Sequence, residues 1–182
     1  NSGAQSAILR LATRKQSEAF LPILLKASRS KDPDSKMLGL RGQISVLLPF
    51  DPIRKSMELV ENHGVKSLAN AVKAVGFAAH YLEFVQSDSV FAFAKGVSGR
   101  QFRNTIRSLA KLKATPHVRL LTWLLDELGQ DPRKAIKDLQ RCEALSLENT
   151  LDTKSKKLDC DRLHMQLLTY VLGNREVFER WK

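Results

Sequence analysis

The strongest constraint on the fold lies in residues 98–129, where two helical patterns follow each other across a short turn. In the first helix, expected over residues 100–113, apolar side chains recur every three or four positions and so share one face. These side chains are Phe102, Ile106, Leu109 and Leu112. A helix with one apolar face buries that face in a core, so the pattern predicts a packed helical domain.

The turn and the second helix carry their own signals. Thr115 offers an N-cap oxygen, and Pro116 takes the first helical position, where its missing N–H costs no hydrogen bond. Apolar residues surround most of the helix that follows, and Gly129 ends it as a C-terminal cap. The second helix is therefore expected to lie buried between neighbours.

Basic side chains occupy the opposite face of the first helix. They form a row with spacings of three and four residues: Arg100, Arg103, Arg107 and Lys111. Cations at this spacing can follow a phosphate backbone, and each phosphate that they neutralise adds to a salt-dependent affinity. An ordinary solvated helix face would show the same pattern, so both interpretations stay open.

Further helix starts recur along the chain. Three Asp-Pro pairs combine an aspartate N-cap with a proline at the first helical position. They are Asp32-Pro33, Asp51-Pro52 and Asp131-Pro132. These starts predict a succession of short helices separated by sharp turns, including helices over residues 52–64, 90–94, 132–147 and 158–173. A final turn or two over residues 176–182 is expected to return Phe178 and Trp181 to the body of the domain.

The N-terminal third is harder to assign. A first helix over residues 4–15 is expected to break near residues 17–19, because Pro22 would interrupt a continuous helix. Residues 36–50 could be helical, although their two glycines weaken a helix by about 1 kcal/mol each. A short strand over residues 43–48 is the alternative.

Two polar stretches, near residues 28–35 and 148–157, are expected to be loops. Apart from residues 43–48, no segment of the chain indicates a strand. We therefore predict a single all-α domain over residues 1–182, built from stacked helical hairpins in the manner of an α-solenoid.

Residues 67–76 and 78–86 form a second candidate hairpin, with Gly76 at the turn. Shifted by 37 residues, its apolar positions superpose on those of the first hairpin, for example Val72 on Leu109. Helical solenoids show periods of this length, but helical hairpins share a period by construction. A true repeat and a chance agreement both stay open.

The same residues can be interpreted as a DNA-binding helix-turn-helix motif. Its second helix would be the recognition helix, yet it contains no Arg or Lys and carries Glu83. A helix that enters the major groove normally presents basic or amide side chains, and here only His80 and Gln86 could serve. A DNA-binding protein is therefore an alternative rather than the main prediction.

One stretch resembles a known family. Residues 106–128, IRSLAKLKATPHVRLLTWLLDEL, resemble the octotricopeptide and related helical-repeat proteins of organelles. Leu109-Ala110-Lys111-Leu112 matches the apolar-Ala-Lys-Leu element of the first repeat helix, and Pro116 matches the turn proline. The resemblance covers about one repeat well and a second weakly, and Lys113 stands where a glycine is common. It implies RNA binding in a mitochondrion or plastid.

Other cations form two weaker groups. The helix expected over residues 132–147 carries basic side chains on its outer side, diluted by Asp138. These are Arg133, Lys134, Lys137 and Arg141. The polar stretch near residue 155 holds Lys154, Lys156 and Lys157, where a phosphate contact and simple solvation are equally compatible with the sequence.

The overall charge supports a polyanionic partner. Lys and Arg number 30 against 19 acidic residues, for a net charge of +11, while 43% of residues are apolar as in globular proteins. Such an excess is typical of proteins that meet nucleic acid or an anionic membrane, although a solubilising surface is the alternative. No apolar run reaches the roughly 18 residues of a membrane span.

No motif for catalysis is present: the sequence contains no phosphate loop, no dinucleotide-binding glycine pattern and no nucleophile elbow. An enzyme and a bound cofactor are therefore not expected. Cys160 and His164 could share a helix face as metal ligands do, with Cys142 as a third, but no fourth ligand is evident. No metal site is predicted, and two cysteines without a disulfide framework fit a reducing compartment.

These observations predict an RNA-binding helical protein that contacts the phosphate backbone through basic helix faces, and an organellar ribosome or another ribonucleoprotein is the kind of assembly that could contain it. A DNA-binding helix-turn-helix protein and a protein-binding helical scaffold are the alternatives. The sequence starts at Asn1, and a removed targeting segment cannot be read from the residues that follow it.

Overall fold

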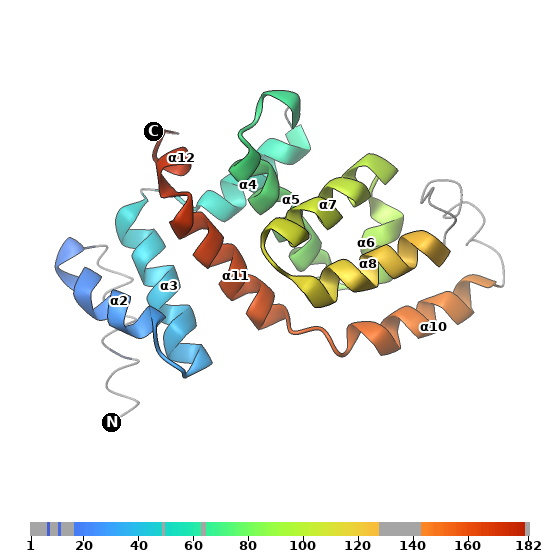
Figure 1. Ribbon diagram of the computed structural model, residues 1–182, viewed down its shortest axis with the longest axis horizontal. Helices are drawn as coiled ribbons and strands as arrows, with labels where there is room; N and C mark the ends of the chain where they lie inside the picture. Colours follow the sequence, from blue (N-terminus) through green and yellow to red (C-terminus); the bar gives the residue numbers. More distant parts are fainter. Residues whose placement is uncertain are drawn as a thin grey trace.

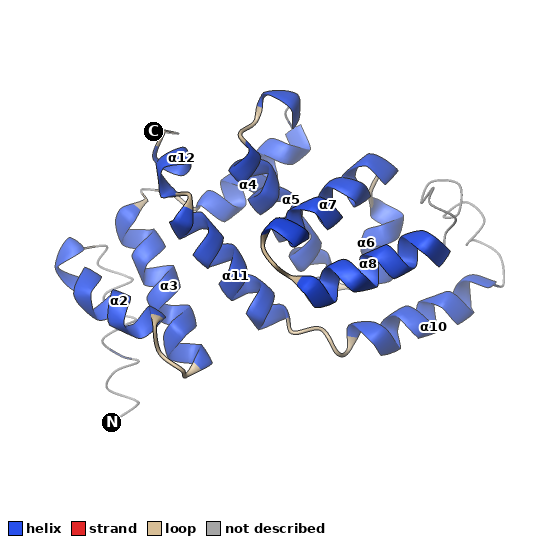
Figure 2. Cartoon of the chain, in the orientation of Figure 1, coloured by secondary structure: helices blue, strands red, loops and turns tan. Residues whose placement is uncertain are grey.

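A computed structural model of the chain describes residues 17–48, 50–62, 65–127 and 143–180, together with Ala7 and Leu11. All regular secondary structure in these residues is helical, as Figure 2 shows, and this confirms the all-α prediction. The helix expected over residues 4–15 falls almost entirely outside the described residues, in which only Ala7 and Leu11 of that segment are described as helical.

The predicted break near Pro22 is present. Ser17 is extended, a short 3₁₀ helix follows at Glu18–Phe20, and α2 begins at Leu21, so that Pro22 lies in the first turn. There its missing N–H costs no intrahelical hydrogen bond. α2 runs over Leu21–Ser28, and the expected loop near residues 28–35 is reduced to residues 29–32.

The ambiguous segment is a helix, and the strand alternative over residues 43–48 is wrong. α3 spans Pro33–Leu47, and α2 packs closely against it. A Cβ built on Gly39 would lie 2.4 Å from the backbone nitrogen of Ser28 in α2. Gly39, one of the two glycines that lower helix propensity in α3, therefore permits two helix backbones to approach, and the packing outweighs the propensity loss.

Two Asp-Pro helix starts are confirmed. The Asp32 carboxylate accepts a hydrogen bond from the Ser35 backbone N–H at 2.9 Å at the start of α3. The Asp51 carboxylate accepts from the Ile53 and Arg54 N–H groups at the start of α4, which spans Pro52–Asn62. The third pair, Asp131-Pro132, lies outside the described residues.

The second candidate hairpin is not a hairpin. After a 3₁₀ turn at Val65–Ser67, one continuous helix, α5, spans Asn70–Ser87. Gly76 is therefore not a turn residue: a Cβ there would lie 2.4 Å from the backbone oxygen of Ser56 in α4. Gly76 serves close helix packing. The second candidate hairpin and the helix-turn-helix interpretation of the same residues are therefore both wrong in their local structure.

The helical hairpin expected over residues 98–129 is present almost as predicted. α6 (Val90–Gly96) leads into α7 (Gly99–Lys111), and α8 follows at Thr115–Glu127. Ser98 caps α7 through a reciprocal pair of hydrogen bonds with Gln101. Thr115 is the first residue of α8 rather than its N-cap, so Pro116 occupies the second position; Gly129 lies outside the described residues.

The C-terminal helices are α10 (Glu143–Ser155), α11 (Cys160–Gly173) and α12 (Arg175–Glu179). The loop expected near residues 148–157 is wrong, because α10 covers most of it. Leu151 is fully buried, and the Thr150 and Thr153 hydroxyls donate to carbonyl oxygens one turn back. The polar residues therefore form the outer face of a helix. Phe178 returns to the core as predicted, and Trp181 lies outside the described residues.

α5 lies at the centre of the described structure. It packs against α4, α6, α7, α11 and α12, and α11 runs diagonally between α3 and α5 (Figure 1). One core cluster extends from α3 to α12, while Leu24 forms a smaller cluster between α2 and α3. Helices adjacent in sequence pack in pairs, but α11 contacts helices far from it in sequence, unlike a helix of a linear solenoid.

A polar pair lies inside this core. The Tyr81 hydroxyl and His117 Nδ1 are 3.2 Å apart, and neither residue is more than 3% exposed. Burial raises the pKa of Tyr81, so its hydroxyl stays protonated, and burial lowers the pKa of His117. A hydrogen bond with the Asp159 backbone has a weaker, opposing effect and raises the pKa of His117.

Replacing Gly76 with Ala should destabilise the protein by about 2 kcal/mol, because the new methyl group meets the α4 backbone, which cannot yield like a flexible side chain. Urea denaturation measures the effect. Gly173→Ala is the matched control, since nothing lies within 4 Å of a Cβ there. Equal stability of the two variants would contradict the proposed helix contact.

Stability should fall as the pH is lowered through about 6.5. Because the folded-state pKa of His117 lies below its ordinary value of 6.5, the unfolded state binds more protons between the two values. The loss of stability is complete once the pH lies below the folded-state pKa of His117. Urea midpoints measured from about pH 8 to about pH 5 should decline in the wild type and decline less in His117→Gln; parallel declines would refute this role for His117.

Candidate nucleic-acid interface

The basic residues of α7 border a groove between α7 and α5. This groove, called the basic groove below, has a volume of about 460 Å³. Its polar side chains come from both helices: Asn70, Lys73, Arg100, Asn104, Arg107, Ser108 and Lys111. No carboxylate is among its described lining residues. A surface of this kind attracts an anion by charge and offers amide groups for hydrogen bonds.

Three of the four residues in the predicted basic row line this groove. Arg100, Arg107 and Lys111 are exposed and follow one another along the side of α7 that faces α5. Arg103 is also exposed but does not line the groove. The spacing explains the difference, since a residue three positions after Arg100 is rotated about 60° from it around the helix.

Sequence reasoning missed four polar residues of the groove: Asn70, Lys73, Asn104 and Ser108. Asn104 lies four residues after Arg100, so its spacing would have placed it on the same face had polar uncharged residues been considered. Asn70 and Lys73 belong to α5, where no local pattern links them to α7. Their position follows from helix packing, in which the Ser108 hydroxyl donates to the Lys73 carbonyl at 3.4 Å.

The cations of the groove are not neutralised within the described structure. Among the described residues, Lys73, Arg100, Arg107 and Lys111 take part in none of the ion pairs, which lie elsewhere. Like charges one helical turn apart repel each other by about 0.2–0.5 kcal/mol per pair, and a bound anion removes that penalty. The groove is therefore chemically suited to a chain of phosphates.

The other predicted cations are placed differently. Arg133, Lys134, Lys137 and Arg141 all lie outside the described residues, so their role stays a prediction. Lys154 belongs to α10 and lies 4.6 Å from the ring centroid of Trp123, as a cation–π contact. Lys156 and Lys157 are exposed in the turn that follows α10.

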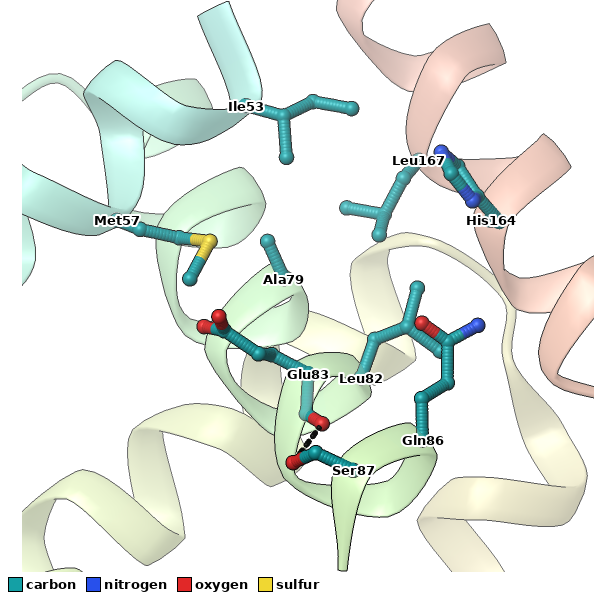
Figure 3. Close-up of a pocket in the computed structure, with 9 residues that line it drawn as sticks. All are labelled: Ile53, Met57, Ala79, Leu82, Glu83, Gln86, Ser87, His164 and Leu167. Carbon is teal, nitrogen blue, oxygen red and sulfur yellow. Dashed lines mark hydrogen bonds between the residues drawn. The ribbon is translucent and has the colours of Figure 1, made fainter.

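A pocket of different character lies between α4, α5 and α11. Figure 3 shows its mostly apolar lining, which includes Ile53, Met57 and Leu167, around a volume of about 310 Å³. Ser87 and His164 also line it, but the Ser87 hydroxyl donates to the backbone oxygen of Glu83 at 2.8 Å. This pocket lacks the positive charge of the basic groove.

His164 is engaged by a cation rather than by a metal ligand set. Its Nδ1 lies 3.3 Å from the Arg41 guanidinium, and burial together with this charge lowers the pKa of His164. Cys160 is half-buried, and burial raises the pKa of its thiol. Within the described residues, no three His, Cys, Asp or Glu side chains are grouped as metal ligands would be.

The end of α7 has an unusual backbone. Lys113 has a φ of 60°, the left-handed conformation that normally favours glycine. The Ala114 N–H donates to the Leu109 carbonyl and the Lys113 N–H donates to the Ala110 carbonyl, which together form a Schellman motif. Lys113 therefore occupies the helix-cap position at which the helical-repeat proteins that residues 106–128 resemble commonly have a glycine.

Comparisons with protein-family models, with curated proteins and with solved structures found no match for the chain. Within the described residues, no helix is both long and apolar enough to cross a membrane. The geometry of the basic groove is thus the main basis for a functional proposal.

Replacing Lys113 with Gly should stabilise the protein by about 1 kcal/mol, because glycine adopts the left-handed conformation without the steric cost of a Cβ atom. Thermal and urea denaturation measure the gain. Lys113→Ala removes the same charge but keeps the Cβ, so it should show no comparable gain. Equal stabilities of the two variants would mean that φ strain is absent.

Proposed function

We propose that this protein binds RNA, and that the phosphate backbone follows the basic groove between α5 and α7. The observation that carries the proposal is the convergence of Lys73, Arg100, Arg107 and Lys111 on one groove with no carboxylate in its described lining. A net charge of +11 adds long-range attraction for a polyanion. Arg103 would add a contact on the exposed face next to the groove.

RNA is favoured over duplex DNA by two considerations. The resemblance of residues 106–128 to organellar helical-repeat proteins implies RNA. In addition, the segment that would serve as a DNA recognition helix is part of α5, where Tyr81 and Leu82 are buried and the exposed Glu83 is acidic. Such a helix is unsuited to the major groove. A place in an organellar ribonucleoprotein belongs to the same proposal.

The stacked-hairpin architecture is the structural part of this proposal. Consecutive helices pack against each other as α2 with α3, α4 with α5 and α7 with α8, which supports hairpins as the building unit. Solenoids of hairpins present extended surfaces along which a nucleic-acid strand can lie. The position of α11 between α3 and α5 distinguishes this arrangement from a simple linear array.

A protein-binding scaffold is the second candidate. It is favoured by Ile23 and Leu25, two large apolar side chains on α2 that are 45% and 43% exposed. Association through such residues would respond little to salt, whereas phosphate binding would weaken steeply. Salt dependence therefore separates the two functions.

The test is the affinity for single-stranded RNA, structured RNA and duplex DNA, each measured by fluorescence anisotropy over a series of salt concentrations. In the groove variant, Lys73, Arg100 and Arg107 are replaced by Ala. The slope of log affinity against log salt should become shallower by about 2, since each lost contact with a single strand removes about 0.7.

A matched control removes the same charge elsewhere. Lys26, Arg29 and Lys31 are exposed in and after α2, and their replacement by Ala should change the slope much less. If the two triple variants change the slope equally, the basic groove is only one part of a generally positive surface and not a specific site. A preference for duplex DNA, or no binding at moderate salt, would overturn the proposal.

A further inference from the structure

A second basic pocket adjoins the basic groove. It lies beside α11, has a volume of about 440 Å³ and is called the α11 pocket below. Lys111 lines both the basic groove and the α11 pocket, so the two adjoin at that side chain. Figure 1 shows how the turn after α7 comes close to α11.

Cations from three separate parts of the chain converge on the α11 pocket. They are Lys36 of α3, Lys111 and Lys113 at the end of α7, and Arg162 of α11. None of them joins an ion pair in the described part of the chain, and no carboxylate is among the described lining residues. Three elements far apart in sequence thus bring positive charge to one site.

The α11 pocket also offers what the basic groove lacks, a half-buried aromatic side chain with polar neighbours. Tyr170 and Met165 line it from α11, together with the amide of Gln166. The Gln166 amide nitrogen donates to the Lys113 carbonyl at 3.2 Å, which fixes the side chain and leaves its oxygen as an acceptor. Phe77, the aromatic residue of the basic groove, is only 3% exposed and cannot stack on a ligand.

The backbone at Lys113 is a further observation on the same site. A left-handed lysine is less stable than a glycine there, yet the lysine places an exposed cation at the pocket. Strained backbone of this kind is found where a side chain serves a ligand. Cations that track phosphates beside an aromatic face are the elements of single-stranded nucleic-acid sites.

We propose that the α11 pocket binds one nucleotide of a single-stranded RNA that leaves the basic groove at Lys111. The phosphate lies against Lys36, Lys113 and Arg162, and the base lies against Tyr170. This inference rests on the proposed function, because the strand has to follow the basic groove before it reaches the α11 pocket.

The test compares the groove variant with a pocket variant in which Lys36, Lys113 and Arg162 are replaced by Ala. Affinities are measured for oligouridylates of about 4 to 16 nucleotides. The pocket variant should bind the shortest oligomers like the wild type and the longest roughly 10-fold more weakly. The groove variant should lose affinity at every length.

Three single substitutions separate binding from stability. Tyr170→Leu should weaken the long oligomers about 10-fold by removing base stacking, while Tyr170→Phe keeps the ring and the affinity. Lys113→Gly should be more stable than the wild type and yet bind the long oligomers less tightly. A residue with a merely structural role would not combine these two effects.

The outcomes distinguish this inference from the proposed function. If the groove variant loses affinity while the pocket variant matches the control that lacks Lys26, Arg29 and Lys31, the α11 pocket is not on the RNA path and the inference is overturned. If the wild type binds no RNA, the proposed function fails and the inference fails with it. Length-dependent loss confined to the pocket and Tyr170→Leu variants supports the inference.

Discussion

Close packing around α5 is the constraint on which the rest of the structure depends. Ten of its eighteen residues are buried, and most of the helices described pack against it. Small residues make this possible: Gly76 lets the α4 backbone approach, and alanines such as Ala74 and Ala78 leave room on other sides. The burial of one such helix supplies much of the apolar area that stabilises the domain.

The candidate interface is a consequence of that packing. α7 turns its apolar side, with Phe102 and Leu109, into the core, and its basic side therefore emerges along the edge of α5. Lys73 meets the α7 cations at this edge because Ser108 holds the two backbones together. The charges repel each other but remain in water, where the repulsion is small. The fold can thus hold Lys73, Arg100, Arg107 and Lys111 along one groove at little cost in stability.

Polar contacts, one pair inside the core and one at the surface, fix the position of α11 beside α7. Tyr81 and His117 join α5 to α8, and His117 in turn contacts the backbone of Asp159 at the start of α11. Gln166 then ties α11 to the carbonyl of Lys113. These contacts hold α11 against the end of α7, which is why cations from distant segments share one pocket. Buried polar groups of this kind are costly unless paired, so they favour a single arrangement.

The sequence alone predicts the local structure: the period of the apolar residues indicates helices, and the aspartate and proline signals mark the starts of α3 and α4. It also located the basic face of α7. Predictions from the sequence were wrong where one local pattern is compatible with two structures. A glycine at position 76 fits both a turn and a close helix contact, and the polar residues 148–155 fit both a loop and the exposed face of a helix. Only tertiary structure decided these cases, because the approach of α4 to α5 and the burial of Leu151 depend on residues distant in sequence. The sequence likewise predicts a row of cations on α7, but the basic groove exists only because α7 packs beside α5.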